Sequence, residues 1–577
     1  MRTQGSRPSA RPSPPARNVS TAVIAVLRRP IASAPIWSWL LALIPWIWVI
    51  PMNQRFWDDW IFVDHKSFEW HLDYWLIVGA KHYLDPFVMP LLYRAGVWLI
   101  HSLSVASACV MAWSFTKVFE KLCWFPQRTL AWFAPMLVVT PVYQARFSGV
   151  TLEYTFSLAL VSVAWHLLLK RKSRKSELAA GVFLALAIGV PSVAILFPFV
   201  FLSAVILPSR GQGPRVWLRE SIRRSYILVI PVAYSLIYSQ LINDVGKYRV
   251  SAGGIVEFLR GLFFLLLVSS LVVIIALRGD RLVFKAHLGL VSALLIGYFC
   301  FFPYLAVGFN PVSAFLPWRV QEQVFAGLLS RLGVVVLALV VIALIALRFA
   351  VRHQRPGQWQ RRIIWLLPAL AFSVIVICLG PMDWESRHWL TAWPFVTLIF
   401  LMVLACADLE WQRPLAIATF FIFLGTSVTI SEEYLIDSLK QRALVRVVSQ
   451  ESESFTESSE ISGDPLLLLV MEDGTSSRLN ARFRTFRSHE WWGIVKEGLG
   501  NDRRDVWILG QDDVTNDVGS SCERPRVAFK LFPQTRTSDW EALRQFRVKV
   551  ALTVERTLVC PDGVRAGWPQ GALPLSE

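Results

Sequence analysis

Long apolar segments recur between residues 33 and 431, and they constrain the fold more than any other feature of the chain. Of the 577 residues, 54% are hydrophobic. A transmembrane helix needs about 20 mainly apolar residues, and fewer within a packed bundle. Thirteen segments meet this requirement, at 33–52, 91–115, 129–144, 151–169, 177–190, 193–207, 225–242, 261–277, 288–308, 331–349, 363–381, 389–406 and 415–431. The sequence therefore predicts an α-helical polytopic membrane protein.

Short basic loops set the predicted orientation. The densest are Lys117–Arg128, Lys170–Lys175, Arg210–Arg224, Arg278–Lys285 and Arg348–Arg362, and they alternate with loops poorer in Lys and Arg. Cytoplasmic loops carry the excess of Lys and Arg in membrane proteins. We therefore expect these loops inside the cell, with an odd number of spans placing the carboxyl terminus outside. The same loops account for the net charge of +17, so no nucleic-acid partner is expected.

Two segments need a separate interpretation. Residues 1–30 are rich in Arg, Ser and Pro, which predicts a disordered cytoplasmic tail. Basic flanks around Leu178–Leu207 require an even number of crossings in a short stretch, so we expect two short helices that meet near Pro191.

The first outward loop, residues 53–90, contains the adjacent acids Asp58 and Asp59 just after the first span. Charge at the edge of a bilayer is costly, so acids there are candidates for function. The alternative is that both carboxylates simply end a hydrophobic helix in solvent.

A helix is predicted further along this loop, from Ser67. Its apolar face would comprise Phe68, Leu72, Trp75, Leu76, Gly79 and Tyr83. Trp and Tyr rings are stable where apolar and wet regions meet, so the helix is expected to lie in the membrane interface. The chain then re-enters the bilayer through Asp85–Pro86 and Pro90.

An acidic pair after span one, an interfacial helix and a proline-containing re-entry together resemble the GT-C glycosyltransferases. The resemblance is specific in Arg55–Asp59 and in the architecture of the loop, and it covers the membrane region 31–431. It implies a polyprenyl-phosphate-linked sugar donor, a glycan or lipid acceptor of the cell envelope, and inversion at the anomeric carbon. It also implies an active site on the outer face of the inner or plasma membrane.

Transfer from a lipid phosphate needs a general base for the acceptor hydroxyl and cations for the departing phosphate. The resemblance places the base at Asp58, with Asp59 orienting the acceptor or a divalent cation such as Mg²⁺ or Mn²⁺. Candidate phosphate-binding residues on the outward side are Arg146, Arg319, Arg387 and His388. Arg387 and His388 could equally anchor the following span at the interface.

Glu153 has two interpretations. It could be a second acid of the site, or a carboxylate at the start of the span at 151–169, where the helix dipole favours negative charge; we favour the second. His65, His71 and His82 share the first loop with several acids but lack helical zinc-site spacing, so no zinc site is predicted there, and dependence on a divalent cation stays open.

Residues 432–577 change in character and are predicted to form a small extracytoplasmic α/β domain. Strands are expected at Asp464–Met471, Val506–Leu509, Arg526–Phe532 and Phe546–Cys560, and a helix at Asn480–Leu499. Cys522 and Cys560 are the two thiols of this region, and an oxidising compartment would allow them to form a disulfide.

Three other classes remain open. A polysaccharide polymerase or a lipid-linked glycan flippase would depend on outward arginines and not on an acid pair. A secondary transporter predicts an internal repeat, and none is visible. A membrane scaffold whose outer domain binds a partner would be insensitive to substitution of Asp58 and Asp59.

Overall fold

The structure is a computed structural model that describes part of the chain. The described residues are 34–47, 49–56, 59–64, 67–78, 84–122, 130–139, 149–170, 173–188, 193, 196–209, 214–230, 232–233, 394, 397, 401, 409–452, 466–470, 488–500, 506–509, 514–515, 526–535, 545, 547 and 549–561. The predicted tail 1–30 and the predicted spans between 261 and 381 lie outside them.

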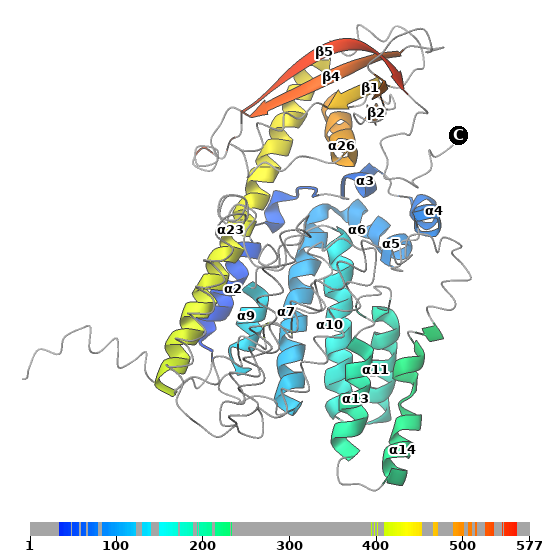
Figure 1. Cartoon of the computed structure of the whole chain (residues 1–577), viewed down its shortest axis with the longest axis vertical. Coiled ribbons are helices and arrows are strands. Elements are labelled where there is room, and N and C mark those ends of the chain that lie inside the picture. The colour runs from blue at the N-terminus through cyan, green and yellow to red at the C-terminus, as the bar shows by residue number, and fades with distance from the viewer. Residues whose placement is uncertain are drawn as a thin grey trace, which may run out of the picture.

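Helices dominate the amino-terminal part, and a sheet lies near the carboxyl end (Figure 1). The helices are α2 (Ile36–Ile47), η1 (Ile50–Met52), α3 (Asp59–Asp64), α4 (Phe68–Val78), α5 (Leu84–Phe87), α6 (Met89–Ala95), α7 (Val97–Leu122), α9 (Phe133–Val139), α10 (Gly149–Lys170), α11 (Arg174–Ala187), α13 (Leu196–Ser209), α14 (Pro214–Arg223), α23 (Leu409–Gln450) and α26 (Ser488–Leu499). The strands are β1 (Leu466–Val470), β2 (Val506–Leu509), β3 (Val514–Thr515), β4 (Arg526–Thr535) and β5 (Val550–Pro561).

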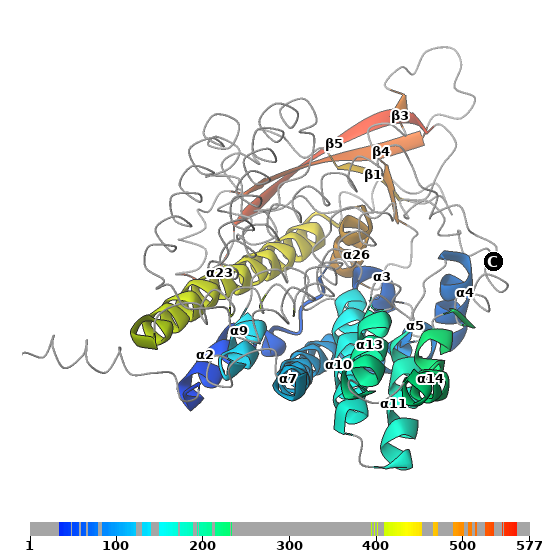
Figure 2. The ribbon, with the colours of Figure 1, turned by 60° about the horizontal axis from the view of Figure 1, so that its bottom comes forward.

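Helix α10 is the centre of the helical bundle and packs against α7, α11 and α13 (Figures 1 and 2). Trp165 of α10 is fully buried and lies 6.2 Å, ring centre to ring centre, from Phe115 of α7. Its indole N–H donates to the Ser203 hydroxyl of α13 at 2.6 Å. A buried indole needs such an acceptor, so the contact ties three helices through one side chain.

Apolar side chains also cover the outside of the bundle. Leu178, Val182 and Leu186 follow one face of α11 and are 72%, 48% and 40% exposed. Ile36, Leu40 and Ile44 form a similar exposed stripe on α2. Continuous apolar stripes are unfavourable in water and stable in hydrocarbon. The described part contains two helices long and apolar enough to cross a membrane, Val97–Leu122 and Leu152–Lys170.

The described helices follow the predicted spans with some differences. The expected pair of short helices on either side of Pro191 is confirmed as α11 and α13. The segment predicted as one span at 91–115 is divided between α6 and α7 at Gly96, whose φ of +119° suits glycine alone. Helix α7 then continues to Leu122, past the predicted end at residue 115.

The last predicted span, 415–431, is part of a longer helix. Helix α23 has 42 residues and continues from Leu409 to Gln450. The boundary expected after residue 431 therefore falls inside one continuous helix, which runs from the bundle to the sheet (Figure 1).

The strands form one sheet in the order β2-β1-β4-β5-β3. The central strand β1 pairs in parallel with β2 and β4, whereas β4 and β5 pair antiparallel. Leu467, Leu468 and Leu469 are all buried, as expected for a parallel strand covered on both faces. The four segments expected to be strands are confirmed as β1, β2, β4 and β5. The helix expected at Asn480–Leu499 is confirmed for Ser488–Leu499, and residues 480–487 lie outside the described residues. We call β1–β5 with α26 the sheet unit; its place outside the membrane stays a prediction.

Candidate active site

Asp59 is the first residue of α3, and reciprocal hydrogen bonds fix it to the turn before the helix. Its backbone N–H donates to the carbonyl of Phe56 at 3.2 Å, and its Oδ2 accepts the N–H of Phe56 at 3.1 Å. An acidic side chain that reaches back to an amide three residues earlier stabilises a helix start in the manner of a capping box. Hydrogen bonds within the local turn thus help to orient this carboxylate.

The second oxygen of Asp59 faces the bundle. Oδ1 accepts the Tyr93 hydroxyl at 2.8 Å and the backbone N–H of Gly149 at 2.6 Å. Gly149 begins α10, so the carboxylate lies at the positive end of that helix dipole. Asp59 is fully buried. Donors from residues 56, 93 and 149 therefore meet on one carboxylate.

Gly149 is needed for this approach. A Cβ at this position would lie 3.1 Å from Oδ1 of Asp59 and would overlap the Tyr93 hydroxyl and the Met89 methyl group. Only a residue without a side chain lets the first amide of α10 reach the carboxylate.

Aromatic rings from α3 and α4 pack beside Tyr93. Phe62 of α3 stacks on Tyr93 with ring centres 5.7 Å apart, and His71 of α4 stacks on Phe62 at 5.5 Å. His71 is fully buried, 6.4 Å from the Tyr93 ring. These rings restrict the orientation of Tyr93, and through it that of Asp59.

The structure describes only part of the predicted apolar face of the loop helix. Phe68 of that face is 45% exposed, and nothing is described of the side chains of Trp75 and Leu76 or of residues 79–83. Trp70 and His71, which the sequence did not place on that face, are buried beside the aromatic rings of Phe62 and Tyr93. The exposed position of Phe68 is compatible with the expected interfacial helix, which stays a prediction.

Glu153 is 8% exposed and lies one turn beyond Gly149 on α10. The favoured interpretation of Glu153 as a helix-start carboxylate is wrong, because the helix begins at Gly149 and its first turn contains no acid. Asp59, from another segment, occupies the helix start instead.

The segment before α3 is held by α23. The Gln54 side-chain amide donates to Oε1 of Gln441, and Arg442 donates to the Met52 carbonyl at 2.9 Å. Asn53 accepts the Trp98 N–H at 2.9 Å, so the same segment also contacts the start of α7. Polar contacts on both sides therefore fix the chain that leads into the acid pair.

Several predicted site residues lie outside the described residues. They are Asp58, Arg146, Arg319, Arg387, His388 and Cys522. Cys560 lies in β5, and nothing is described of its side chain. Of the predicted site, the structure therefore places Asp59 and Glu153 near the start of α10. Within the described residues, no group of His, Cys, Asp and Glu could hold a metal ion.

Sequence reasoning missed Tyr93 and Gly149. Tyr93 follows the predicted re-entry at Pro90 by three residues, and Gly149 precedes the span predicted to begin at residue 151. A glycine just before a helix is a known signal for close backbone approach, and it could have identified Gly149.

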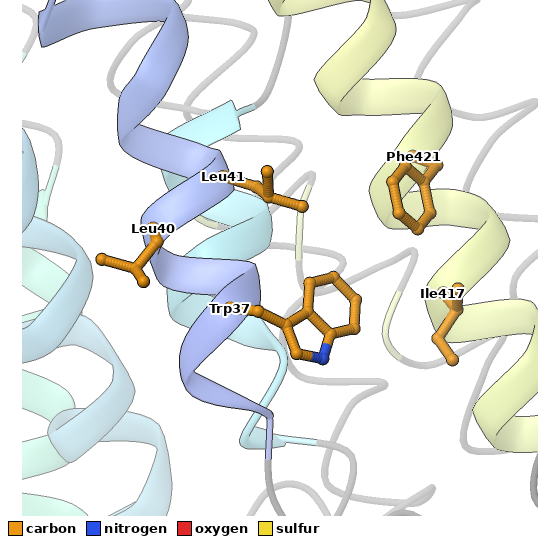
Figure 3. A pocket seen from close by; sticks show the side chains of 5 residues that line it. All are labelled: Trp37, Leu40, Leu41, Ile417 and Phe421. Carbon is orange, nitrogen blue, oxygen red and sulfur yellow. The ribbon is translucent and has the colours of Figure 1, made fainter.

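An apolar groove lies between α2 and α23, away from these polar groups (Figure 3). It has a volume of about 450 Å³ and is lined by Trp37, Leu40, Leu41, Ile417 and Phe421. The ring of Trp37 stacks on Phe421 with centres 5.9 Å apart. This lining suits hydrocarbon and offers no charged group to a phosphate.

Comparisons with known proteins gave one structural likeness to report. No family model and no curated protein matches the chain. Among solved structures, the chain is similar to that of ArnT from Cupriavidus metallidurans bound to undecaprenyl phosphate. The sequences are 14% identical, the TM-score is 0.35, and the alignment covers 91% of this chain and 97% of ArnT. A likeness at this level does not establish a common fold.

Proposed function

We propose that this protein is an inverting glycosyltransferase that moves a sugar from a polyprenyl-phosphate donor to a glycan or lipid acceptor of the cell envelope. The observation that carries the proposal is the set of hydrogen bonds that fixes the segment carrying Asp58 and Asp59, which we call the acidic segment. The Asp59 carboxylate accepts hydrogen bonds from Phe56, Tyr93 and Gly149, and Asp58 precedes Asp59 directly in the chain. A catalytic group needs such a rigid support to act from a defined position.

The reaction requires one proton acceptor near the anomeric carbon. Asp58 takes the proton of the acceptor hydroxyl, whose oxygen attacks the anomeric carbon from the face opposite the phosphate. The bond between that carbon and the phosphate oxygen breaks, and the polyprenyl phosphate leaves with the electron pair. Inversion follows from this single displacement.

The contacts of Asp59 favour Asp58 as the base. Both oxygens of Asp59 already accept hydrogen bonds, and the side chain is fully buried. A carboxylate engaged in this way is poorly placed to accept a proton from an acceptor hydroxyl. Asp59 therefore fixes the position of the adjacent Asp58.

Cations would stabilise the negative charge that develops on the phosphate. Arg146, Arg319, Arg387 and His388 are the proposed donors for this role, all on the outward side in the predicted topology. Arg146 precedes Gly149 by three residues in the sequence, and the Gly149 N–H donates to Asp59.

Of the acids that the structure describes, Asp59 does not fit a bound divalent cation well. N–H and O–H donors point at both oxygens of Asp59, and their hydrogens would repel Mg²⁺ or Mn²⁺. Glu153 lies one turn beyond Gly149 on α10 and stays a proposed second acid of the site. No step of the reaction is assigned to a metal.

The test is transfer of sugar from a polyprenyl-phosphate donor by the full chain in nanodiscs. Asp58→Asn keeps the shape of the side chain but cannot take the proton, so turnover should fall about 10²–10⁴-fold with the fold intact. Asp73→Asn is the matched control, because Asp73 lies in the same loop and is exposed. Unchanged turnover in Asp58→Asn, Asp59→Asn and the double variant would end the assignment.

A further inference from the structure

We propose that the sheet unit is a positioning element for the acidic segment, and that it acts through Trp60. This inference rests on the proposed function for its activity readout. The side chains of the consecutive residues Asp59 and Trp60 contact opposite parts of the molecule. Asp59 contacts the bundle at Gly149, whereas Trp60 belongs to the hydrophobic core of the sheet unit. Figure 1 shows α3 between α26 and the ends of α6 and α10.

Trp60 is buried as completely as a core residue of the sheet unit. It is 1% exposed and clusters with Trp491 and Ile494 of α26, Leu444 of α23 and Leu468 of β1. Burial of a large aromatic side chain is among the strongest single contributions to an interface. The first two residues of α3 thus cannot move relative to α26 without disrupting that core.

Gly493 makes the contact possible. A Cβ at Gly493 would lie 2.9 Å from Cδ2 and 3.1 Å from Cβ of Trp60, and it would overlap another ring carbon. Carbon atoms in contact prefer a separation of about 3.5–4.0 Å, so any side chain at 493 must push Trp60 away. Because Asp59 is bonded to Trp60 through the main chain, the displacement reaches the carboxylate.

Arg55 adds a second connection on the same side. Its guanidinium donates to Oε2 of Glu497 at 2.7 Å and lies 4.9 Å from the centre of the Trp60 ring. The salt bridge is partly exposed, so its energy alone is small. Its geometric effect is to cover the Trp60 ring and to join the residues before α3 to α26.

Helix α23 connects the bundle to the sheet unit and holds the two parts together. The same helix supplies Gln441 and Arg442 to the segment before α3 and Leu444 to the core around Trp60. The acidic segment is therefore held between a continuous helix and α26. Removal of the Trp60 contact would weaken the connection of this segment to α26, which would then depend on the partly exposed salt bridge between Arg55 and Glu497.

The experiment compares two helical glycines in the full chain. Gly493→Ala should displace Trp60, whereas a Cβ at Gly425 of α23 meets nothing within 4 Å. Sugar transfer and amide hydrogen exchange are measured for wild type, Gly493→Ala and Gly425→Ala in nanodiscs. Displacement of a reacting group by about 1 Å can cost about 10²-fold, so kcat of Gly493→Ala should fall by about that factor.

The expected pattern separates positioning from general damage. KM for the donor should stay near its wild-type value in Gly493→Ala, and exchange should rise in residues 56–64 without a rise across α7 and α10. Adding Trp60→Leu should restore part of the turnover, because the shorter side chain vacates the space that the added methyl group needs. Gly425→Ala should match wild type.

Turnover and exchange in Gly493→Ala equal to those of Gly425→Ala would overturn the inference. A global rise in exchange that Trp60→Leu does not relieve would also overturn it. If the wild-type chain transfers no sugar, the proposed function fails, and the exchange of residues 56–64 alone then decides the positioning role.

Discussion

Two charged side chains are buried at opposite ends of the bundle, and they are stabilised differently. Asp59, near the start of α10, accepts hydrogen bonds from the neutral groups of Phe56, Tyr93 and Gly149. Arg224, which follows α14, is 1% exposed and donates to Glu177 of α11 at 2.9 Å. Glu177 also binds Arg223 at 2.7 Å.

The difference concerns what each arrangement can do. An Arg–Glu cluster brings opposite charges together and connects two helices, which is a structural task. Backbone and hydroxyl donors instead hold a carboxylate through directed dipoles, and they fix its orientation to within the geometry of a hydrogen bond. We therefore expect substitutions around Asp59 to lower the rate of sugar transfer, and substitutions around Arg224 to lower the stability of the protein alone.

Among substitutions that test this comparison, the largest effect is expected from Asp59→Asn. An amide has one oxygen and one NH₂ group, so whichever way it turns, its NH₂ faces N–H or O–H donors that now bind Asp59. A buried donor left unsatisfied costs about 1–3 kcal/mol. The free energy of unfolding should fall by about that amount, and sugar transfer should fall about 10²-fold because the support of Asp58 is lost.

Denaturant unfolding and transfer assays on the same nanodisc preparation would measure both quantities. Asp73→Asn, on the exposed surface of α4, should change neither. Wild-type stability in Asp59→Asn would show that the contacts of this carboxylate carry little energy, and the comparison with Arg224 would lose its basis.

A smaller loss of sugar transfer than in Asp59→Asn is expected from Gly149→Ala. The added methyl group must displace the Tyr93 hydroxyl and Met89. Overpacking of this kind costs about 1–3 kcal/mol. In contrast, a Cβ at Gly181 of α11 would meet Tyr226 at 3.5 Å, an ordinary contact, so Gly181→Ala should stabilise its helix by about 0.5–1 kcal/mol.

The pair of glycine variants would be compared by thermal unfolding and by the rate of sugar transfer. Gly149→Ala should lower both, whereas Gly181→Ala should leave transfer unchanged. If both substitutions stabilise the protein equally, the close approach of α10 to Asp59 is not needed.

The sequence predicted those described helices and strands that depend on local apolar patterns, and it missed α3, α14 and β3. Apolar runs located α7, α10, α11 and α13, and short β-branched or leucine-rich runs located β1, β2, β4 and β5. Helix ends were less accurate: the predicted span boundaries missed the break at Gly96 and the continuation of α23 past residue 431. The apolar run ends near residue 431, but the polar residues that follow are also compatible with a helix, so this change in composition does not mark a helix end.

The candidate site was predicted only in part. The acid pair stood out because charge beside an apolar span is unusual. The partners of Asp59 could not be identified in the same way, since residues 59, 93 and 149 are brought together only by tertiary packing. The burial of Trp60 in the sheet unit depends on residues more than four hundred positions away, such as Gly493. No local sequence pattern indicates contacts between residues so far apart in the chain.

The smallest effect on function is expected from Arg224→Met. Methionine fills much of the space of the arginine stem but removes the charge. Breaking a buried ion pair costs about 3–5 kcal/mol when the partner is left uncompensated. Here Glu177 is 25% exposed and keeps Arg223 at 2.7 Å, so the loss should be smaller, about 1–3 kcal/mol.

The adjacent residue supplies the control for this variant. Arg223 is 50% exposed and contacts Glu177 and Glu220, so Arg223→Met should cost only about 0–1 kcal/mol. Neither variant should change kcat or KM of sugar transfer once the fraction of folded protein is matched, because neither residue contacts the acidic segment in the described structure. A fall in kcat in folded Arg224→Met would show that this end of the bundle also controls the site, and that burial of charge does not separate structural from catalytic roles in this protein.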